Sequence, residues 1–131
     1  MAGLWLNFYG VKVTAWFLWK HPENITRFLK AYIEGAEKAF GDEKWAKEVI
    51  AKRFKTNDPK VIDATYRDYV ASTAHDLTPS VEGAKSVLAQ LKAIKLQVGS
   101  DNPMDYLDLG LIDKLKAEGF ISAMQTQYGV K

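Results

Sequence analysis

The sequence predicts a mainly α-helical single domain, residues 1–131, with one or two short β-strands at its N-terminus. Apolar side chains recur at helical spacing from Ile25 to Phe40, the longest such run in the chain. The four prolines stand at or beside expected helix starts, where the missing N–H costs nothing. Residues 11–15 instead alternate apolar and polar side chains, which is the period of a strand.

The N-terminal segment, residues 1–19, is expected to hold the strands and a cluster of aromatic side chains. Gly10 predicts a turn between an extended piece and the strand, and residues 16–20 are expected to form a helical turn. Lys12 interrupts the apolar run, no basic region precedes it and no cleavage site follows, so we expect no signal peptide in this chain. The aromatic cluster is expected to pack against another surface; it comprises Trp5, Phe8, Tyr9, Trp16, Phe17 and Trp19.

Residues 22–121 are expected to form a helical segment that opens with a long amphipathic helix. Pro22 fits its first position, and Gly41 supplies the stop. If Phe28 is buried, its replacement by alanine should cost about 3–5 kcal/mol. The face expected to point inward carries Ile25, Phe28, Leu29, Tyr32, Ile33, Ala36 and Phe40.

Three further helices are expected, each with a polar residue or a proline at its start. Asp42 caps the first of them, residues 56–59 begin the next, and Pro79 or Ser80 begins the third after a loop. The side chains expected to face inward are Trp45, Val49, Ile50 and Phe54, then Ile62, Tyr66, Tyr69 and Val70, then Val81, Ala84, Val87, Leu88, Leu91 and Ile94.

The last segment with clear helix start and stop signals runs from residue 101 to residue 121. Asn102 or Asp101 is expected to cap a short helical turn that Pro103 begins. Asp108 is expected to cap a second helix, which Gly119 and Phe120 end. Its inward side chains are expected to be Leu109, Leu111, Ile112 and Leu115.

The sequence carries no recognisable catalytic, metal-binding or cofactor-binding pattern, so we expect neither an enzyme nor a cofactor. It has no cysteine, and its two histidines, His21 and His75, are expected to be solvated surface residues. The net charge of +2 is too small to indicate nucleic-acid binding. Asp105 and Asp108 are three residues apart, but capping or surface roles are favoured over acid–base chemistry.

Two motifs follow one another in the chain. They comprise Phe17, Leu18, Pro22, Glu23, Arg27, Phe28, Ala31 and Tyr32, then Pro103, Asp105, Tyr106, Asp108, Gly119 and Phe120. In this order they resemble the C-terminal portion of solute-binding proteins of ABC importers, in the group of the nitrate, sulfonate, taurine and thiamine-precursor binders. After a strand, that family has an F-L-x-x-x-P-E pattern and an R-F-x-x-A-Y helix; near its end it has a P-x-D-[FY]-x-D turn, a helix and Gly-Phe. The family's fold is the type II periplasmic-binding-protein α/β fold.

This resemblance implies a partial lobe of a two-lobed protein whose ligand lies in the cleft between the lobes. The implied parent is periplasmic or lipid-anchored outside the cytoplasm, and its partners are a small-molecule ligand and an ABC permease. The implied ligand is a small anion or heterocycle. Asn7, Tyr9 and Thr14 lie near where the family's strands border the cleft, so they are the candidate ligand-binding residues.

Two other readings of the sequence remain open beside transport. The chain is alternatively a stand-alone helical protein-interaction module that uses its aromatic N-terminal surface. An enzyme is the remaining alternative, which loss of turnover on changing Asp105 or Asp108 would support. Because a strand without neighbours leaves an unpaired edge, we also expect self-association, as a dimer, through residues 4–19.

Overall fold

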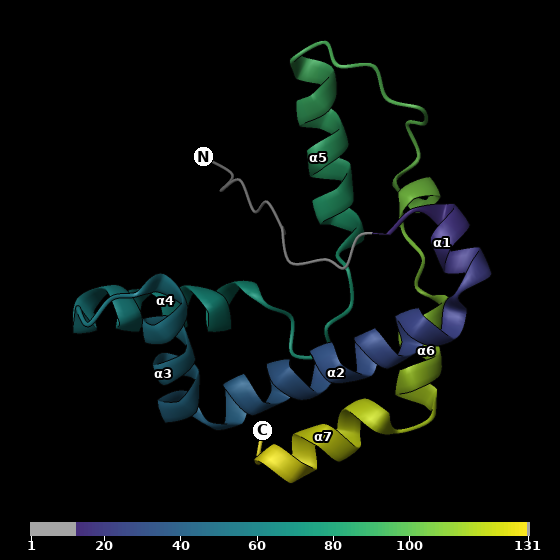
Figure 1. Cartoon of the computed structure of the whole chain (residues 1–131). Helices are drawn as coiled ribbons and strands as arrows, with labels where there is room; N and C mark the ends of the chain where they lie inside the picture. The colour runs from purple at the N-terminus through teal and green to yellow at the C-terminus, as the bar shows by residue number, and fades with distance from the viewer. Residues whose placement is uncertain (1–12, 131) are drawn as a thin grey trace.

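The structure, a computed structural model, describes residues 13–130, which form seven α-helices and one 3₁₀ helix (Figure 1). None of these residues lies in a β-strand, so the prediction of a mainly α-helical chain is confirmed. The elements are α1 (Ala15–Lys20), α2 (Pro22–Gly41), α3 (Glu43–Phe54), α4 (Pro59–Ser72), α5 (Val81–Ala93), η1 (Pro103–Tyr106), α6 (Gly110–Ala117) and α7 (Phe120–Tyr128).

The helix starts follow from local side-chain caps, largely as the sequence predicts. The Asp42 carboxylate accepts a hydrogen bond from the Trp45 N–H at 2.9 Å and starts α3. Asp58, Ser80 and Asn102 cap α4, α5 and η1 in the same way. Each cap satisfies a backbone donor that the first turn of a helix leaves without a partner.

The predicted strand over residues 11–15 is wrong in its described part. Val13 and Thr14 are not in a strand, and Ala15 already begins α1. The cause is local, because the Thr14 hydroxyl accepts a hydrogen bond from the Phe17 N–H at 3.2 Å and caps that helix. The remaining strand residues, including Val11, lie outside the described part of the chain.

The end of the chain departs from the prediction at two points. The N-cap of α6 is Leu109, one residue later than the Asp108 that was predicted. The Asp108 carboxylate still accepts a hydrogen bond from the Gly110 N–H at 2.9 Å. Gly119, with φ of 75°, ends α6 as predicted. The chain then turns directly into α7, a helix that the sequence analysis did not anticipate.

The best-buried core lies where α2, α6 and α7 meet. Ile33 and Leu115 are fully buried, and Ile112 and Ile121 complete the cluster. Leu29, Leu77, Leu109, Phe120 and Met124 pack around it.

Helix α2 is the central element of the described chain. It contacts α1, α3 and α7, whereas α4 packs on α3 and α5 packs on η1. Figure 1 shows α2 and α7 running side by side, with α5 extending away from them. Several helices have a neighbouring helix on one side only, and we call this loosely packed arrangement of α1–α7 an open frame. No helix within residues 13–130 is long and apolar enough to cross a membrane.

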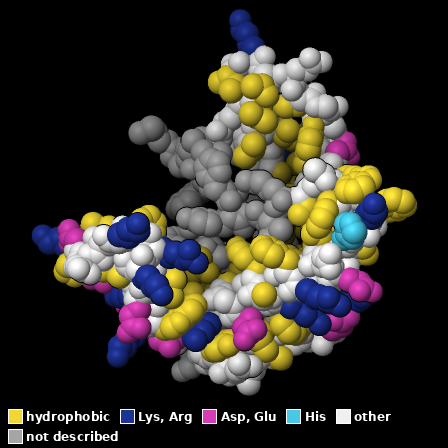
Figure 2. Space-filling view, in the orientation of Figure 1, with side chains coloured by type: hydrophobic (Ala, Val, Ile, Leu, Met, Phe, Trp, Pro, Cys, Tyr) yellow, Lys and Arg dark blue, Asp and Glu magenta, His cyan; other side chains and the backbone are white. Residues whose placement is uncertain are grey.

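The open frame leaves many large apolar side chains exposed, which contradicts several predictions of burial. Phe28 is 54% exposed, so it is not a core residue, and Val49, Phe54 and Ile94 are also exposed although each was predicted to face inward. Trp16 and Trp19 of α1, predicted to be packed, are 60% and 80% exposed. Figure 2 shows such apolar patches across the visible face.

Gly41 ends α2 at a close approach to the end of α7. A Cβ atom at this position would lie 2.0 Å from the carbonyl oxygen of Tyr128, which is backbone. Glycine is therefore required here for space, because Gly41 itself keeps a helical conformation.

Candidate functional site

The structure gives the sequence-predicted ligand residues little support as a site. Asn7 and Tyr9 lie outside the described residues. Thr14 is exposed, and its hydroxyl is already used as the cap of α1. A ligand role for these three residues stays a prediction.

The two acidic residues of the C-terminal motif hold turns together. Asp105 accepts hydrogen bonds from the Ser100 hydroxyl and from the Asn102 side-chain amide, at 2.5 Å and 3.1 Å. Asp108 bonds the backbone at the start of α6. Both carboxylates therefore have the structural contacts expected of capping residues, and both are exposed.

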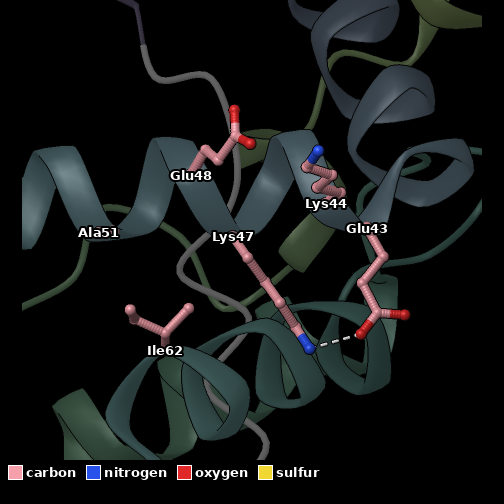
Figure 3. Close-up of a pocket in the computed structure, with 6 residues that line it drawn as sticks. All are labelled: Glu43, Lys44, Lys47, Glu48, Ala51 and Ile62. Atoms are coloured by element: carbon pink, nitrogen blue, oxygen red, sulfur yellow. Dashed lines mark ion pairs between the residues drawn. The ribbon is translucent and has the colours of Figure 1, made fainter. Parts of the chain in front are cut away.

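A shallow, open hollow of about 600 Å³ lies between α3 and α4 (Figure 3). Lys47 reaches across it, with its ammonium 2.5 Å from Glu43 and 2.7 Å from Asp63. The hydrogen bond to Asp63 raises the pKa of Lys47 most, and the hydrogen bond to Glu43 raises it further, so this amine stays charged and paired. The lining thus contains one ion pair, Lys47 with Glu43, beside the charged side chains of Lys44 and Glu48, and Ile62 and Ala51 are its apolar part.

A buried polar cluster joins α2, α7 and the loop after α4. Glu37 of α2 is 0% exposed, and one carboxylate oxygen accepts a hydrogen bond from the Gln125 amide at 3.2 Å. The same amide donates to the His75 carbonyl at 3.2 Å. Among the described residues, the other Glu37 oxygen has no hydrogen-bond partner, and neither has the buried hydroxyl of Thr73.

Burial dominates the electrostatics of this cluster. It raises the pKa of Glu37, while the Gln125 hydrogen bond and the charge of His75 act in the opposite direction. The His75 ring stacks on Phe40 with centroids 4.4 Å apart, and Phe40 stacks on Tyr69 at 5.5 Å. The aromatic stack fixes the histidine loop beside Glu37.

A second polar contact pins the same loop to α6. The Lys116 ammonium lies 2.8 Å from the Asp76 carboxylate and also bonds the Thr78 hydroxyl. The Thr78 N–H donates to Asp76 at 3.0 Å. The Lys116 hydrogen bond is the main reason that the pKa of Asp76 is lowered to about 2. Lys116, Asp76 and Thr78 all bond one another, so this contact holds the loop against α6.

The aromatic side of α1 is an exposed apolar surface. None of its residues is buried, and Trp16, Phe17 and Trp19 are exposed. The Lys20 ammonium lies 4.7 Å from the Trp16 ring centroid, and the His21 and Phe17 rings are 5.0 Å apart. Aromatic side chains are enriched at protein interfaces.

The sequence analysis missed Glu37, although a signal existed. Glu37 lies four residues after Ile33 and three before Phe40, so it falls on the apolar stripe of α2. A charged residue at such a position is buried when the stripe is covered, and α7, which covers it, was not anticipated.

The described residues contain no cluster of three or more side chains able to hold a metal ion. No family model, no curated protein and no solved structure matches the chain.

Proposed function

We propose that this chain forms the helical C-terminal part of the substrate-binding component of an ABC importer. Its cargo is a small anion or heterocycle of the kind represented by nitrate, sulfonates, taurine and thiamine precursors. The component binds its cargo outside the cytoplasm and delivers it to a permease, and it performs no chemistry.

The observation that carries the proposal is that both resembling motifs occupy helix boundaries. Pro22 and Glu23 open the 20-residue helix α2, as the family pattern requires. Pro103 begins η1, and Gly119 ends α6 in a left-handed conformation directly before Phe120. The two motif regions are joined through the core, because α2, α6 and α7 share one apolar cluster.

The exposed apolar side chains are a second support. Phe28 belongs to the resembling R-F-x-x-A-Y pattern, yet it is 54% exposed here. In a two-lobed binding protein, the sheet and helices of the same lobe would cover such a position. Covering exposed apolar surface is favourable by about 25 cal/mol per Å², so the proposal gives the open frame a physical reason.

The first test is to read the DNA upstream of the Met1 codon. The proposal expects an open frame that encodes an α/β lobe. The longer protein is then titrated by calorimetry with taurine, an alkanesulfonate, nitrate and a hydroxymethylpyrimidine. Binding of one of these compounds supports the proposal; a stop codon before Met1, or a longer protein that binds none of them, overturns it.

Substitutions then locate the ligand. Asn7→Ala and Tyr9→Phe are expected to weaken binding by the longer protein without changing its far-UV circular dichroism. Thr126→Val is the control, because Thr126 is an exposed residue of α7 whose hydroxyl donates to the Ser122 carbonyl one turn earlier. Equal affinity of all variants would show that the ligand lies elsewhere.

A protein-interaction module is the second candidate, and the exposure of Trp16 and Trp19 favours it. We expect the chain to self-associate through residues 4–19, of which residues 13–19 are described. Light scattering at micromolar concentration measures this directly. A clean monomer at tens of micromolar would refute self-association, and a dimer that persists in the Trp16→Ser and Trp19→Ser variants would show that it forms through another surface.

A further inference from the structure

The contact between α2 and α7 is built around one fully buried carboxylate. Glu37 is 0% exposed, and its only hydrogen bond among the described residues is the one from Gln125. Gln125 also bonds the loop carbonyl of His75, so one amide joins α7 to α2 and to that loop. A carboxylate with an unpartnered oxygen in such a place is costly when ionised.

We propose that Glu37 is the proton-sensitive part of a latch that fastens α7 and the loop after α4 to α2. With Glu37 protonated, the latch is closed and no charge is buried. With Glu37 ionised, the buried negative charge favours opening of α7, which brings the carboxylate into water. This inference is independent of the proposed transport role, because it concerns contacts within the described residues only.

The direction of the pH effect follows from burial. Burial raises the pKa of Glu37 in the closed state, whereas an opened α7 leaves a solvated glutamate with a pKa of about 4.3. The closed latch is therefore fully stabilised below about pH 4. Its stability decreases as pH rises from there to the closed-state pKa and then levels off. Across that range, the opening constant increases by at most about tenfold per pH unit, the limit for one proton.

Other titratable groups lie around the latch and must be separated from it. His75 belongs to the latched loop, and its charge opposes the effect of burial on Glu37. Glu34, one turn earlier on α2, accepts a hydrogen bond from the Tyr128 hydroxyl of α7 at 3.1 Å. Asp76, the next residue of the loop, is paired with Lys116 of α6 at 2.8 Å.

The experiment is amide hydrogen exchange of the whole chain between pH 4 and pH 8, corrected for the intrinsic exchange rate. In the wild type, protection of α7 amides should decrease with pH, while α3 and α4 serve as internal references. Glu37→Gln keeps the size and cannot ionise, so its α7 protection should not change with pH. Glu23→Gln is the control, because Glu23 is an exposed carboxylate of α2 that pairs with Arg27 of the same helix, and it should retain the wild-type slope.

Two results would overturn the latch. One is a Glu37→Gln protein whose α7 protection changes with pH as in the wild type. The other is a His75→Gln protein that loses the slope while Glu37 remains, because the sensor would then be the histidine.

A measurement on the unmodified protein decides the matter if Glu37→Gln does not fold. The carboxyl carbon of Glu37 is titrated by nuclear magnetic resonance, together with the α7 amides. A Glu37 midpoint above about 4.3, the value of a solvated glutamate, and shared with the α7 amide shifts supports the latch. A Glu37 midpoint at or below that value overturns it.

Discussion

Two glycines of α2 give a sharp test of the packing between α2 and α7. Gly41 and Gly35 both have helical conformations and differ in what surrounds them. A Cβ atom on Gly41 would meet the Tyr128 backbone, whereas one on Gly35 would have no neighbour within 4 Å. We therefore expect Gly41→Ala to destabilise the chain and Gly35→Ala to stabilise it.

The magnitude at Gly41 follows from three distances. The added Cβ would lie 2.0 Å from the Tyr128 carbonyl oxygen, 2.9 Å from its carbon and 3.0 Å from its Cβ. Ordinary contact begins at 3.4 Å, so the end of α7 must move by more than 1 Å. Overpacking of this kind costs about 1–3 kcal/mol, which exceeds the helix-propensity gain at a terminal position.

Gly35 isolates the propensity effect. In a helix interior, alanine is more favourable than glycine by roughly 0.5–1 kcal/mol. Because nothing obstructs the new methyl group, Gly35→Ala should show this gain without a packing cost.

The assay is thermal unfolding of both variants followed by far-UV circular dichroism. For a chain of this size, 1 kcal/mol corresponds to roughly 3–5 °C in Tm. Gly41→Ala should lower the Tm and Gly35→Ala should raise it. A Gly41→Ala protein at least as stable as the wild type would refute the close approach of α7 to α2.

Three further predictions concern single contacts and are checked by unfolding measurements on matched variants. Phe28→Ala should lower the free energy of unfolding of this chain by less than about 1 kcal/mol, because the ring is half exposed. In a longer protein that covers the ring, the same substitution should cost about 3–5 kcal/mol. Equal small costs in both proteins would count against the proposed covering lobe. Tyr66→Phe should cost about 1 kcal/mol, because the Tyr66 hydroxyl bonds the Ala39 carbonyl at the end of α2 at 3.2 Å; an unchanged urea midpoint would contradict this. The Asp76–Lys116 pair should stabilise the fold above about pH 4 and lose that contribution as pH falls towards 2, since the pKa of Asp76 is lowered to about 2. Asp76 is more than half exposed, so Lys116→Met should lower the free energy of unfolding by roughly 1 kcal/mol or less at pH 6. A loss of the same size at pH 2 would show that another contact is responsible.

Helix boundaries were predictable because their causes are local. Asp58 with Pro59 starts α4, and Asn102 with Pro103 starts η1, through side chains adjacent to the boundary itself. Helix α7 was missed because it has no side-chain cap; the left-handed Gly119 ends one helix and precedes the next.

Burial was less predictable, since periodicity shows which side of a helix is apolar without showing what covers it. Ile33 and Ile94 were both predicted to face inward on apolar helix stripes, yet Ile33 is fully buried against α6 and α7 and Ile94 is exposed. The polar cluster at Glu37 was missed for the same reason, because its burial depends on a helix about 90 residues further along the chain.

The contact between α2 and α7 also closes a long loop of chain. About 80 residues, from α3 to α6, lie between the two helices. The entropy of closing such a loop grows only with the logarithm of its length, so ten added residues cost about 0.1 kcal/mol. Lys95 and the exposed Leu96 lie in the turn after α5, and Figure 1 shows α5 extending away from α2 and α7. A fluorophore-binding peptide inserted in this turn should therefore report on the protein at little cost to the contact between α2 and α7.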